Sequence, residues 1–428
     1  MLFILESSAI NDFAFSEFLA GKIILQPLLA RSSAIAFPIP LVAPVIKTFI
    51  LQKYGFESFL RFICSMIHKE VKRVLVAPLD WGAGHATRCI PVIRELIAQN
   101  VTPVLAGSKT VLARFNAEFP NLEQVHLPDQ HIKYSKILPA WLAILLQTKN
   151  IVRVIEKEHQ HLKTILIENK IDALISDNRY GLSGSGVPSV IITHQLNLQI
   201  PFLLKTFGFV TQHFINKKLS AFDEIWIPDV NRKPNLSGKL SEIKQHKNVQ
   251  YIGPLSRFKT ALSTEQIRYD LAIILSGPAP QPQRMLQKIL VNLPTSVTQI
   301  AVLSSIKYAV QENRSNFNIH WLTNASDTEF SNCLSASTFI IARSGYSTLM
   351  DLVRLNRNAL LIPTPGQTEQ IYLARHFQDH FGFVALHQSK ITRHNIASKI
   401  NDLKLKNRQT FPNQENNLKE VLQNFLKY

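Results

Sequence analysis

The alternation of apolar and polar runs along the chain predicts parallel β-sheets covered by helices. From Val71 onward, short apolar runs of strand length alternate with longer segments whose apolar residues recur at helical spacing. Strands that are apolar throughout are typical of parallel sheets, which are buried on both faces. The pattern predicts strands at 74–79, 102–106, 122–127, 173–176, 189–193, 224–227, 249–252, 271–275, 300–303, 319–322, 339–342 and 360–363.

The predicted helices fall between these strands and divide the chain into two halves. They span 90–96, 109–118, 140–169, 285–291, 349–355, 371–377 and 414–428, the last with Leu418, Leu422 and Phe425 on one face. We interpret Gly253–Ser256 as the linker between the halves. The sequence therefore predicts an α/β protein with domains at 70–255 and 256–410 and a closing helix at 414–428.

The first 65 residues do not follow this pattern. Their apolar run from Ala34 to Leu51 contains three prolines, which argue against a membrane-spanning helix, and the start has no basic region typical of a signal peptide. We expect residues 1–65 to be a poorly ordered extension, or to lie upstream of a true translation start near Met66.

Composition narrows the classes of partner. The 428 residues are 46% hydrophobic, enough for a large core, and carry a formal net charge of +17, which points to an anionic partner. The three cysteines are far apart and indicate neither a disulfide framework nor a zinc site. Because no nucleic-acid-binding motif is present, we expect no nucleic-acid partner.

Two basic and apolar segments leave membrane contact open. Residues 132–149 and 200–220 combine leucine, phenylalanine or tryptophan with lysines. Such segments fit a surface that rests on an anionic bilayer, and they equally fit helices that face the core with a basic solvated edge.

Glycines and a histidine follow the first strand. Gly82 and Gly84 permit a tight turn, and His85 stands where the next helix begins. Free N–H groups of a first helical turn point over the carboxyl edge of the sheet, so His85 is placed to act as a base. A turn whose glycines serve packing, with the histidine as a cap, is the structural alternative.

Further polar residues follow later strands of the first half. Asp177 and Arg179 come directly after the strand at 173–176, and His194 follows the strand at 189–193. Open α/β sheets bind ligands at this carboxyl edge, so these residues are candidates for the acceptor side of a site. Asp177 capping a turn and His194 buried in the core are the structural alternatives.

The second half has a polar turn of its own. The strand at 339–342 runs into Arg343, Ser344, Gly345, Tyr346, Ser347 and Thr348, and a helix follows. Hydroxyls, unpaired N–H groups and an arginine at a helix start suit a phosphate, although an ordinary capped helix has the same composition.

The second half, above all Ala342–Ala374, resembles the nucleotide-sugar-binding domain of the family that contains the bacterial lipid II-forming N-acetylglucosaminyltransferase. The loop at Gly82–His85 resembles a shortened form of that family's glycine-rich N-terminal loop. The resemblance implies a GT-B fold, in which two Rossmann-like domains face a cleft, the C-terminal one holding the donor and the N-terminal one the acceptor.

The resemblance also implies roles for individual residues. His85 corresponds to the family's histidine at the reacting centre, and Asp351 stands where the family has a glutamate that holds the ribose. Glu369 replaces the first of two adjacent sugar-contacting glutamines, and Gln370 matches the second. The residues corresponding to the family's diphosphate loop and phosphate turn are Ser276, Gly277, Ser344, Gly345, Ser347 and Thr348, with Arg343 beside them.

The expected activity is transfer of a sugar from a nucleotide-diphospho sugar, with UDP as the expected nucleotide, to a hydroxyl of a lipid or cell-envelope glycan. We expect inversion at the anomeric carbon, no metal and no cofactor, because helix N-termini serve the phosphates and His85 serves as base. The expected location is cytoplasmic, with peripheral membrane contact left open. A non-catalytic protein that binds a nucleotide sugar or lipid, and a nucleotide-sugar epimerase, are the alternatives.

Overall fold

The computed structural model describes residues 71–80, 83–128, 140–184, 186–199, 205–244, 246–258, 266–277, 279–309, 317–406 and 417–427. All of them belong to one compact unit, Glu70–Tyr428. The expectation for residues 1–65 lies outside the described residues.

The first half forms a seven-stranded parallel sheet in the order β3-β2-β1-β4-β5-β6-β7. Its strands are β1 (Arg73–Pro78), β2 (Thr102–Gly107), β3 (Gln124–His126), β4 (Ala173–Asp177), β5 (Ser189–Ile192), β6 (Glu224–Ile227) and β7 (Val249–Tyr251). Its helices are α4 (Ala83–Ala98), α5 (Lys109–Glu118), α6 (Ala140–Glu168) and α7 (Lys205–Leu219), with 3₁₀ turns at Tyr180–Leu182 and Gly238–Ser241.

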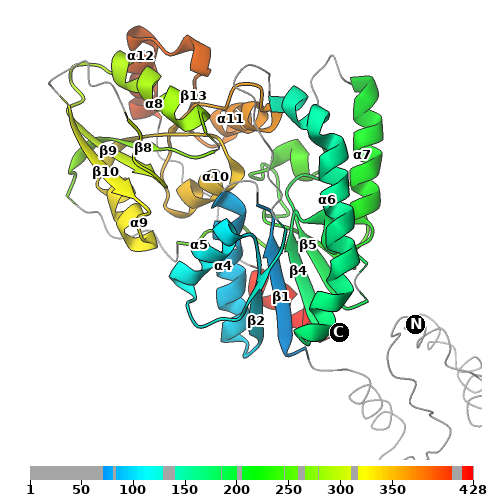
Figure 1. The fold of residues 1–428 in the computed structure, drawn as a ribbon. Coiled ribbons are helices and arrows are strands. Elements are labelled where there is room, and N and C mark those ends of the chain that lie inside the picture. Colours follow the sequence, from blue (N-terminus) through cyan, green and yellow to red (C-terminus); the bar gives the residue numbers. More distant parts are fainter. Residues whose placement is uncertain are drawn as a thin grey trace, which may run out of the picture. The chain divides into compact units, whose positions relative to one another are not determined.

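Alternate residues of β1 explain how this sheet is covered on both faces. Val74 and Val76 belong to the apolar cluster that includes α4 and α5, whereas Leu75 and Ala77 pack in the cluster that includes α6. Figure 1 shows the helices on the two sides of the sheet. Because both faces are buried there, the central strands β1, β4 and β5 are mostly apolar, as the sequence pattern predicted. The edge strands β3 and β7 are more exposed and contain polar residues.

The second half forms a six-stranded parallel sheet in the order β10-β9-β8-β11-β12-β13. Its strands are β8 (Tyr269–Ile274), β9 (Gln299–Ser304), β10 (Asn318–Thr323), β11 (Ser337–Ala342), β12 (Leu360–Leu361) and β13 (Val384–Ala385). Its helices are α8 (Gln281–Asn292), α9 (Asp327–Ser335), α10 (Tyr346–Arg354), α11 (Thr368–His380) and α12 (Arg393–Leu405), with a 3₁₀ turn at Gln388–Lys390.

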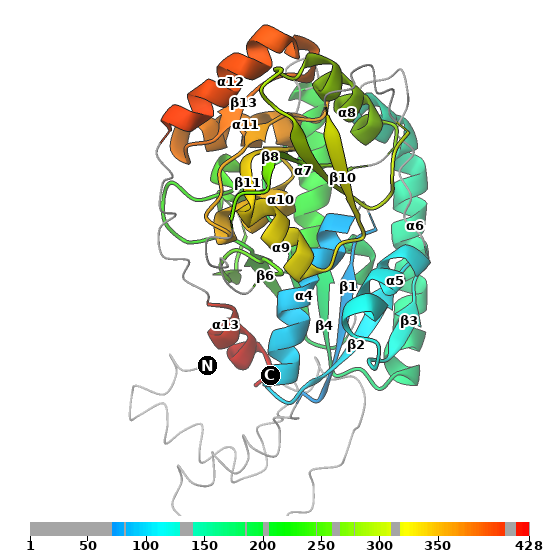
Figure 2. The same ribbon diagram turned by 90° about the vertical axis from the view of Figure 1, so that its left-hand side faces the viewer.

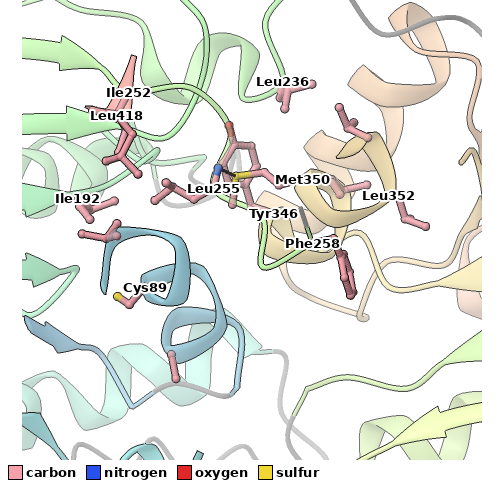
Figure 3. Close-up of a cluster of buried hydrophobic side chains, with 14 of the residues drawn as sticks. Cys89, Ile192, Leu236, Ile252, Leu255, Phe258, Tyr346, Met350, Leu352 and Leu418 are labelled. Carbon is pink, nitrogen blue, oxygen red and sulfur yellow. Dashed lines mark hydrogen bonds between the residues drawn. The ribbon is translucent and has the colours of Figure 1, made fainter. Parts of the chain in front are cut away.

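An apolar cluster joins the two halves. Cys89 of α4 and Met350 of α10 belong to the same buried cluster, together with Leu255 of the segment between the sheets (Figure 3). The backbone N–H of Leu255 donates to the Met350 sulfur at 3.3 Å. α4 and α10 are therefore packed directly on each other, as Figures 1 and 2 also show.

The last helix returns to the first half. In α13 (Leu418–Phe425), Leu418, Leu422 and Phe425 are buried, and the Phe425 ring meets the Trp226 ring edge-on at 5.5 Å. α13 also contacts α4. The C-terminal helix thus packs against the first half of the chain.

Candidate active site

The order of the strands in the two sheets indicates where a ligand site is expected. Connections change direction between β1 and β4 in the first sheet and between β8 and β11 in the second. Loops leave the sheet in opposite directions at such a switch point, which opens a crevice at the carboxyl ends of the strands. Asp177 is the last residue of β4, and His85, Ser276 and Ser344 follow β1, β8 and β11.

Asp177 is the centre of a buried polar cluster in the first half. It is fully buried and accepts from Arg88 Nε at 2.5 Å, and a second guanidinium nitrogen of Arg88 also contacts its carboxylate. His85 Nδ1 lies 3.1 Å from Asp177 Oδ1. Burial by itself raises the pKa of this carboxyl, but Arg88 and His85 outweigh it and hold the pKa at about 2. Asp177 is therefore an anion that fixes the ring of His85.

The His85 ring has one nitrogen committed and one available. Because a carboxylate accepts hydrogen bonds, Nδ1 carries the proton that faces Asp177, and the lone pair of the neutral ring lies on Nε2. The His85 side chain is 17% exposed, whereas Asp177 is 0% exposed. The arrangement allows His85 to accept a proton from a group that approaches Nε2.

The start of α4 differs from the expected loop. The helix already begins at Ala83, so Gly84 and His85 lie in its first turn. The Ser347 hydroxyl donates to the Gly84 carbonyl at 3.0 Å, and a Cβ on Gly84 would lie 3.0 Å from the Ser347 oxygen. Gly84 therefore serves the close approach of α10. Gly82 lies outside the described residues.

His194 connects the two halves. Its Nε2 lies 2.8 Å from Glu369 Oε1 on α11, and its ring stacks on Tyr346 of α10 with centroids 4.0 Å apart. Its Nδ1 lies 3.4 Å from Arg88 Nη1. Burial lowers the pKa of His194, whereas the Glu369 carboxylate opposes that shift.

The turn at 343–348 opens α10 with unblocked backbone donors. Gly345 is the N-cap residue and has no side chain to cap the helix. The Ser344 hydroxyl donates to the Gln370 carbonyl at 2.7 Å, and the Gln370 side chain accepts from the Thr364 N–H at 2.8 Å. Gln370 thereby ties the loop after β12 to this turn.

Arg343 lies behind the turn and contacts carbonyl oxygens. Its guanidinium donates to Ile362 and Pro363 at 3.1 Å each and to Gln281 at 3.1 Å. Burial lowers its pKa to about 10, which leaves it a cation at neutral pH. Arg343 therefore ties this turn to the segment after β12 and to the start of α8, and its charge acts on the turn from behind.

The loop after β8 lies beside this turn. Gly277 has a φ of +95°, a conformation that favours glycine, and nothing lies within 4 Å of a Cβ built there. A glycine is therefore favoured here by the backbone conformation and not by close packing, because a side chain would have space. The neighbouring Ser276 is half-buried.

Two candidate residues point away from the His85 cluster. Arg179 is fully buried, donates to Glu158 at 2.6 Å and also contacts the Pro78 and Pro128 carbonyls. Asp351 accepts from the Ser256 hydroxyl at 2.6 Å, and its other oxygen lies 3.7 Å from Arg257 Nε. Burial raises the pKa of Asp351 to about 6 despite Arg257. Arg179 holds loops together, and Asp351 faces the segment between the sheets.

Sequence reasoning missed Arg88 and Tyr346 as members of the site. Arg88 follows His85 by three residues, so both lie on one face of a helix, a spacing that is visible in the sequence. Tyr346 donates to the Pro228 carbonyl at 2.9 Å, a contact across 118 residues that no local pattern indicates.

Among the residues that the structure describes, no three or more His, Cys, Asp or Glu side chains are grouped to hold a metal ion. No helix in the described ranges has both the length and the apolar character needed to cross a bilayer.

Comparisons with known proteins agree with this architecture. Residues 283–427 match the profile of the glycosyltransferase family 28 C-terminal domain. No curated protein sequence matches the chain. Arabidopsis thaliana UGT89C1 is structurally similar, with a TM-score of 0.58 and 13% identity over 83% of this chain and 100% of that chain.

Two further solved structures have the same fold. MurG of Acinetobacter baumannii aligns with a TM-score of 0.51 and 16% identity over 83% of this chain and 99% of that chain. LpCGTa, solved in complex with UDP, aligns with a TM-score of 0.55 and 13% identity over 83% and 99%. The resemblance seen in the sequence is confirmed: the described chain has the GT-B fold, and its second half is similar to the family 28 glycosyltransferase C-terminal domain, which supports sugar transfer as the class of its activity.

Proposed function

We propose that the chain transfers a sugar from a nucleotide-diphospho sugar, with UDP as the nucleotide, to a hydroxyl of a lipid or cell-envelope glycan. The observation that carries the proposal is the pair of His85 and Asp177, 3.1 Å apart, beside the open helix turn of the second half. A base and a phosphate-binding turn are the two parts that such a transfer requires.

His85 is the base in this proposal. The acceptor oxygen attacks the anomeric carbon, the bond from that carbon to the diphosphate breaks, and the acceptor proton passes to His85 Nε2. Asp177 orients the ring and stabilises the imidazolium that forms, while Arg88 keeps Asp177 ionised. Attack from the face opposite the leaving group inverts the anomeric configuration, so an NMR assignment of a product with the donor's configuration would refute this step.

The donor diphosphate lies at the start of α10 in this proposal. The N–H groups of the first turn and the hydroxyls of Ser347 and Thr348 face it, and Arg343 adds positive charge from behind. This arrangement neutralises the departing diphosphate without a metal. Because Ser347 now donates to Gly84, the diphosphate must replace that bond. Ribose binding at Asp351 must likewise replace the bond from Ser256.

Ligand-induced stabilisation tests the donor site. We expect UDP-glucose or UDP-N-acetylglucosamine to raise the melting temperature of the full chain, because a ligand that binds the folded state stabilises it. Ser347→Ala should reduce that shift, whereas His394→Ala, at an exposed position far from the turn in sequence, should leave it unchanged. No shift with UDP, GDP, dTDP or CMP sugars would overturn the donor assignment.

Peripheral contact with an anionic membrane is a further part of the proposal. The predicted segments 132–149 and 200–220 lie partly outside the described residues, but α7 has no acidic residue and has Lys217 and Lys218 in its last turn. Co-sedimentation should be stronger with vesicles that contain anionic phospholipid than with neutral vesicles, and added salt should weaken it. Equal sedimentation with both would refute the contact.

A further inference from the structure

His194 lies where both halves of the molecule meet around the candidate base. It follows β5 of the first sheet, yet its ring stacks on Tyr346 and its Nε2 meets Glu369, both from the second half. The two rings are nearly parallel, with an interplanar angle of 8°. Of its side chain, 4% is exposed. Elements from both halves therefore fix His194 in position.

The partners of His194 determine where its proton lies. Arg88 can only donate, so Nδ1 of His194 offers its lone pair to Arg88. Glu369 is ionised, because His194 and the nearby His85 and Arg88 hold its pKa below the usual range against the effect of burial. Nε2 of His194 therefore carries the proton and donates to Glu369 at 2.8 Å.

These contacts form a continuous path to the base. Glu369 binds His194, His194 contacts Arg88, Arg88 holds Asp177 through two nitrogens, and Asp177 holds His85. The path begins one residue before Gln370, whose carbonyl receives the Ser344 hydroxyl of the donor turn. The ring of His85 is thus connected to the second half through four side-chain contacts.

We propose that His194 is a positioning residue that holds the His85–Asp177 pair in its alignment through Arg88, with Glu369 as its partner on the second half. This inference rests on the proposed function. It also gives Glu369 a role that differs from the sugar contact implied by the glutamine at this position in the resembling family. Because the Glu369 carboxylate is bound to His194, it serves the contact between the two halves.

The alignment is tested with four variants of the full chain. His194→Gln retains an acceptor for Arg88 and a donor for Glu369, and Glu369→Gln retains an acceptor for His194. His194→Ala and Glu369→Ala remove these contacts. His394→Ala is the control, since it changes an exposed histidine outside the described site.

Turnover is measured as release of UDP from UDP-glucose or UDP-N-acetylglucosamine with water as the acceptor of the sugar, and affinity for UDP is measured by calorimetry. We expect His194→Ala and Glu369→Ala to lower kcat about 10-fold or more, with UDP affinity within about 3-fold of wild type. The two Gln variants should recover most of the rate. Equal losses in the Gln and Ala variants, or a loss confined to UDP affinity, would overturn the proposal.

Hydrogen–deuterium exchange separates this inference from the proposed function, because it needs no turnover. His194→Ala should increase amide exchange in peptides from 364–374, at the start of α11, whereas His394→Ala should not. If the protein binds no nucleotide sugar but His194→Ala still increases exchange, the contact between His194 and Glu369 stands and only the proposed function is refuted. Unchanged exchange in His194→Ala would refute the role of this contact.

Discussion

At the scale of single residues, the candidate site contains a buried ion pair between Asp177 and Arg88. The Asp177 carboxylate binds Arg88 and His85, and all three positions lie at the carboxyl edge of the first sheet or in the helix that follows β1. Removing one member of a buried pair leaves the other charge without compensation, which costs far more than an exposed pair would.

Asp177→Asn should lower the free energy of unfolding by about 3–5 kcal/mol at pH 7, because Arg88 stays buried without its counter-charge. The folded pKa of about 2 lies below the ordinary value of 3.8, so the ionised carboxylate contributes about 2 kcal/mol above pH 4. That contribution is lost as the pH falls from about 4 to 2. Denaturant unfolding across this range should show the two proteins converging; a constant difference would contradict the assignment.

Gly238 is a residue of the first half on which close packing against the second half depends. It has a φ of +55°, and a Cβ there would overlap the Tyr372 hydroxyl and lie 2.9 Å from His376 Cε1 on α11. We expect Gly238→Ala to destabilise the chain by about 2–4 kcal/mol through strain and overlap. Gly186→Ala, with a φ of +80° and free space, should cost only the backbone strain of about 1 kcal/mol.

Thermal and denaturant unfolding measure both glycine variants. Adding Tyr372→Phe to Gly238→Ala removes the overlapping hydroxyl and should restore part of the loss. Equal effects of the two glycine substitutions would show that close packing against α11 is unimportant.

At the scale of elements, the residues at the N-terminus of a helix decide whether its first backbone N–H groups are available to a ligand. α9 begins with a capping box in which the side chains of Ser326 and Glu329 accept from each other's backbone N–H groups. α10 begins at Gly345 and lacks such a side chain, so its donors remain for a ligand. α9 precedes β11 in the chain and α10 follows it, yet of these two helices only α10 fits a phosphate site.

α13 packs on β6 and on α4, the helix that carries His85. Phe425→Ala removes the ring that meets Trp226 and should lower the free energy of unfolding by about 3–5 kcal/mol. Leu405→Ala, at a residue that is 84% exposed, should change it by less than about 0.5 kcal/mol. Denaturant unfolding distinguishes the two, and similar small effects would mean that α13 is not part of the cooperative core.

At the scale of the whole molecule, the segment between the sheets carries a charged cluster. Arg257 lies 3.2 Å from Asp327 of α9 and 3.7 Å from Asp351 of α10, and its guanidinium stacks over Phe330 at 4.5 Å. Arg94 of α4 donates to the Arg257 carbonyl at 2.7 Å. Charges from both halves thus converge on this segment.

Asp351 should make stability depend on pH in the opposite sense to Asp177. Its folded pKa of about 6 exceeds the ordinary 3.8, so the folded state binds the proton more tightly and stability falls as the pH rises from about 4 to 6. The loss amounts to about 3 kcal/mol. Asp351→Asn should abolish this slope in denaturant unfolding measured from pH 4 to 7, and an unchanged slope would contradict the raised pKa.

The sequence predicted the elements better than the contacts between them. β6 and α5 have the predicted bounds, because apolar runs and helical spacing are local signals. α9 was missed although its capping box is visible, as was α12, whose buried Ile396, Ile400 and Leu403 have helical spacing.

Only part of the site could be predicted from the sequence, and the reason is physical. The carboxyl edge of a parallel sheet gathers residues that follow its strands, so His85 and Asp177 could be expected near each other. The contact of His194 with Glu369 spans 175 residues and depends on how the halves pack, which no local pattern encodes. The structural use of Arg179 and Arg343 likewise depends on loops that become neighbours only in the folded chain.

The most direct test of the central claim is the rate of UDP release from a UDP-sugar, with water as the acceptor of the sugar, by wild type and His85→Ala, with His394→Ala as the histidine control. If His85 is the base, kcat should fall about 100-fold or more in His85→Ala while UDP affinity and folding remain near wild type. His394→Ala should keep the wild-type rate. Unchanged turnover in His85→Ala would contradict the account.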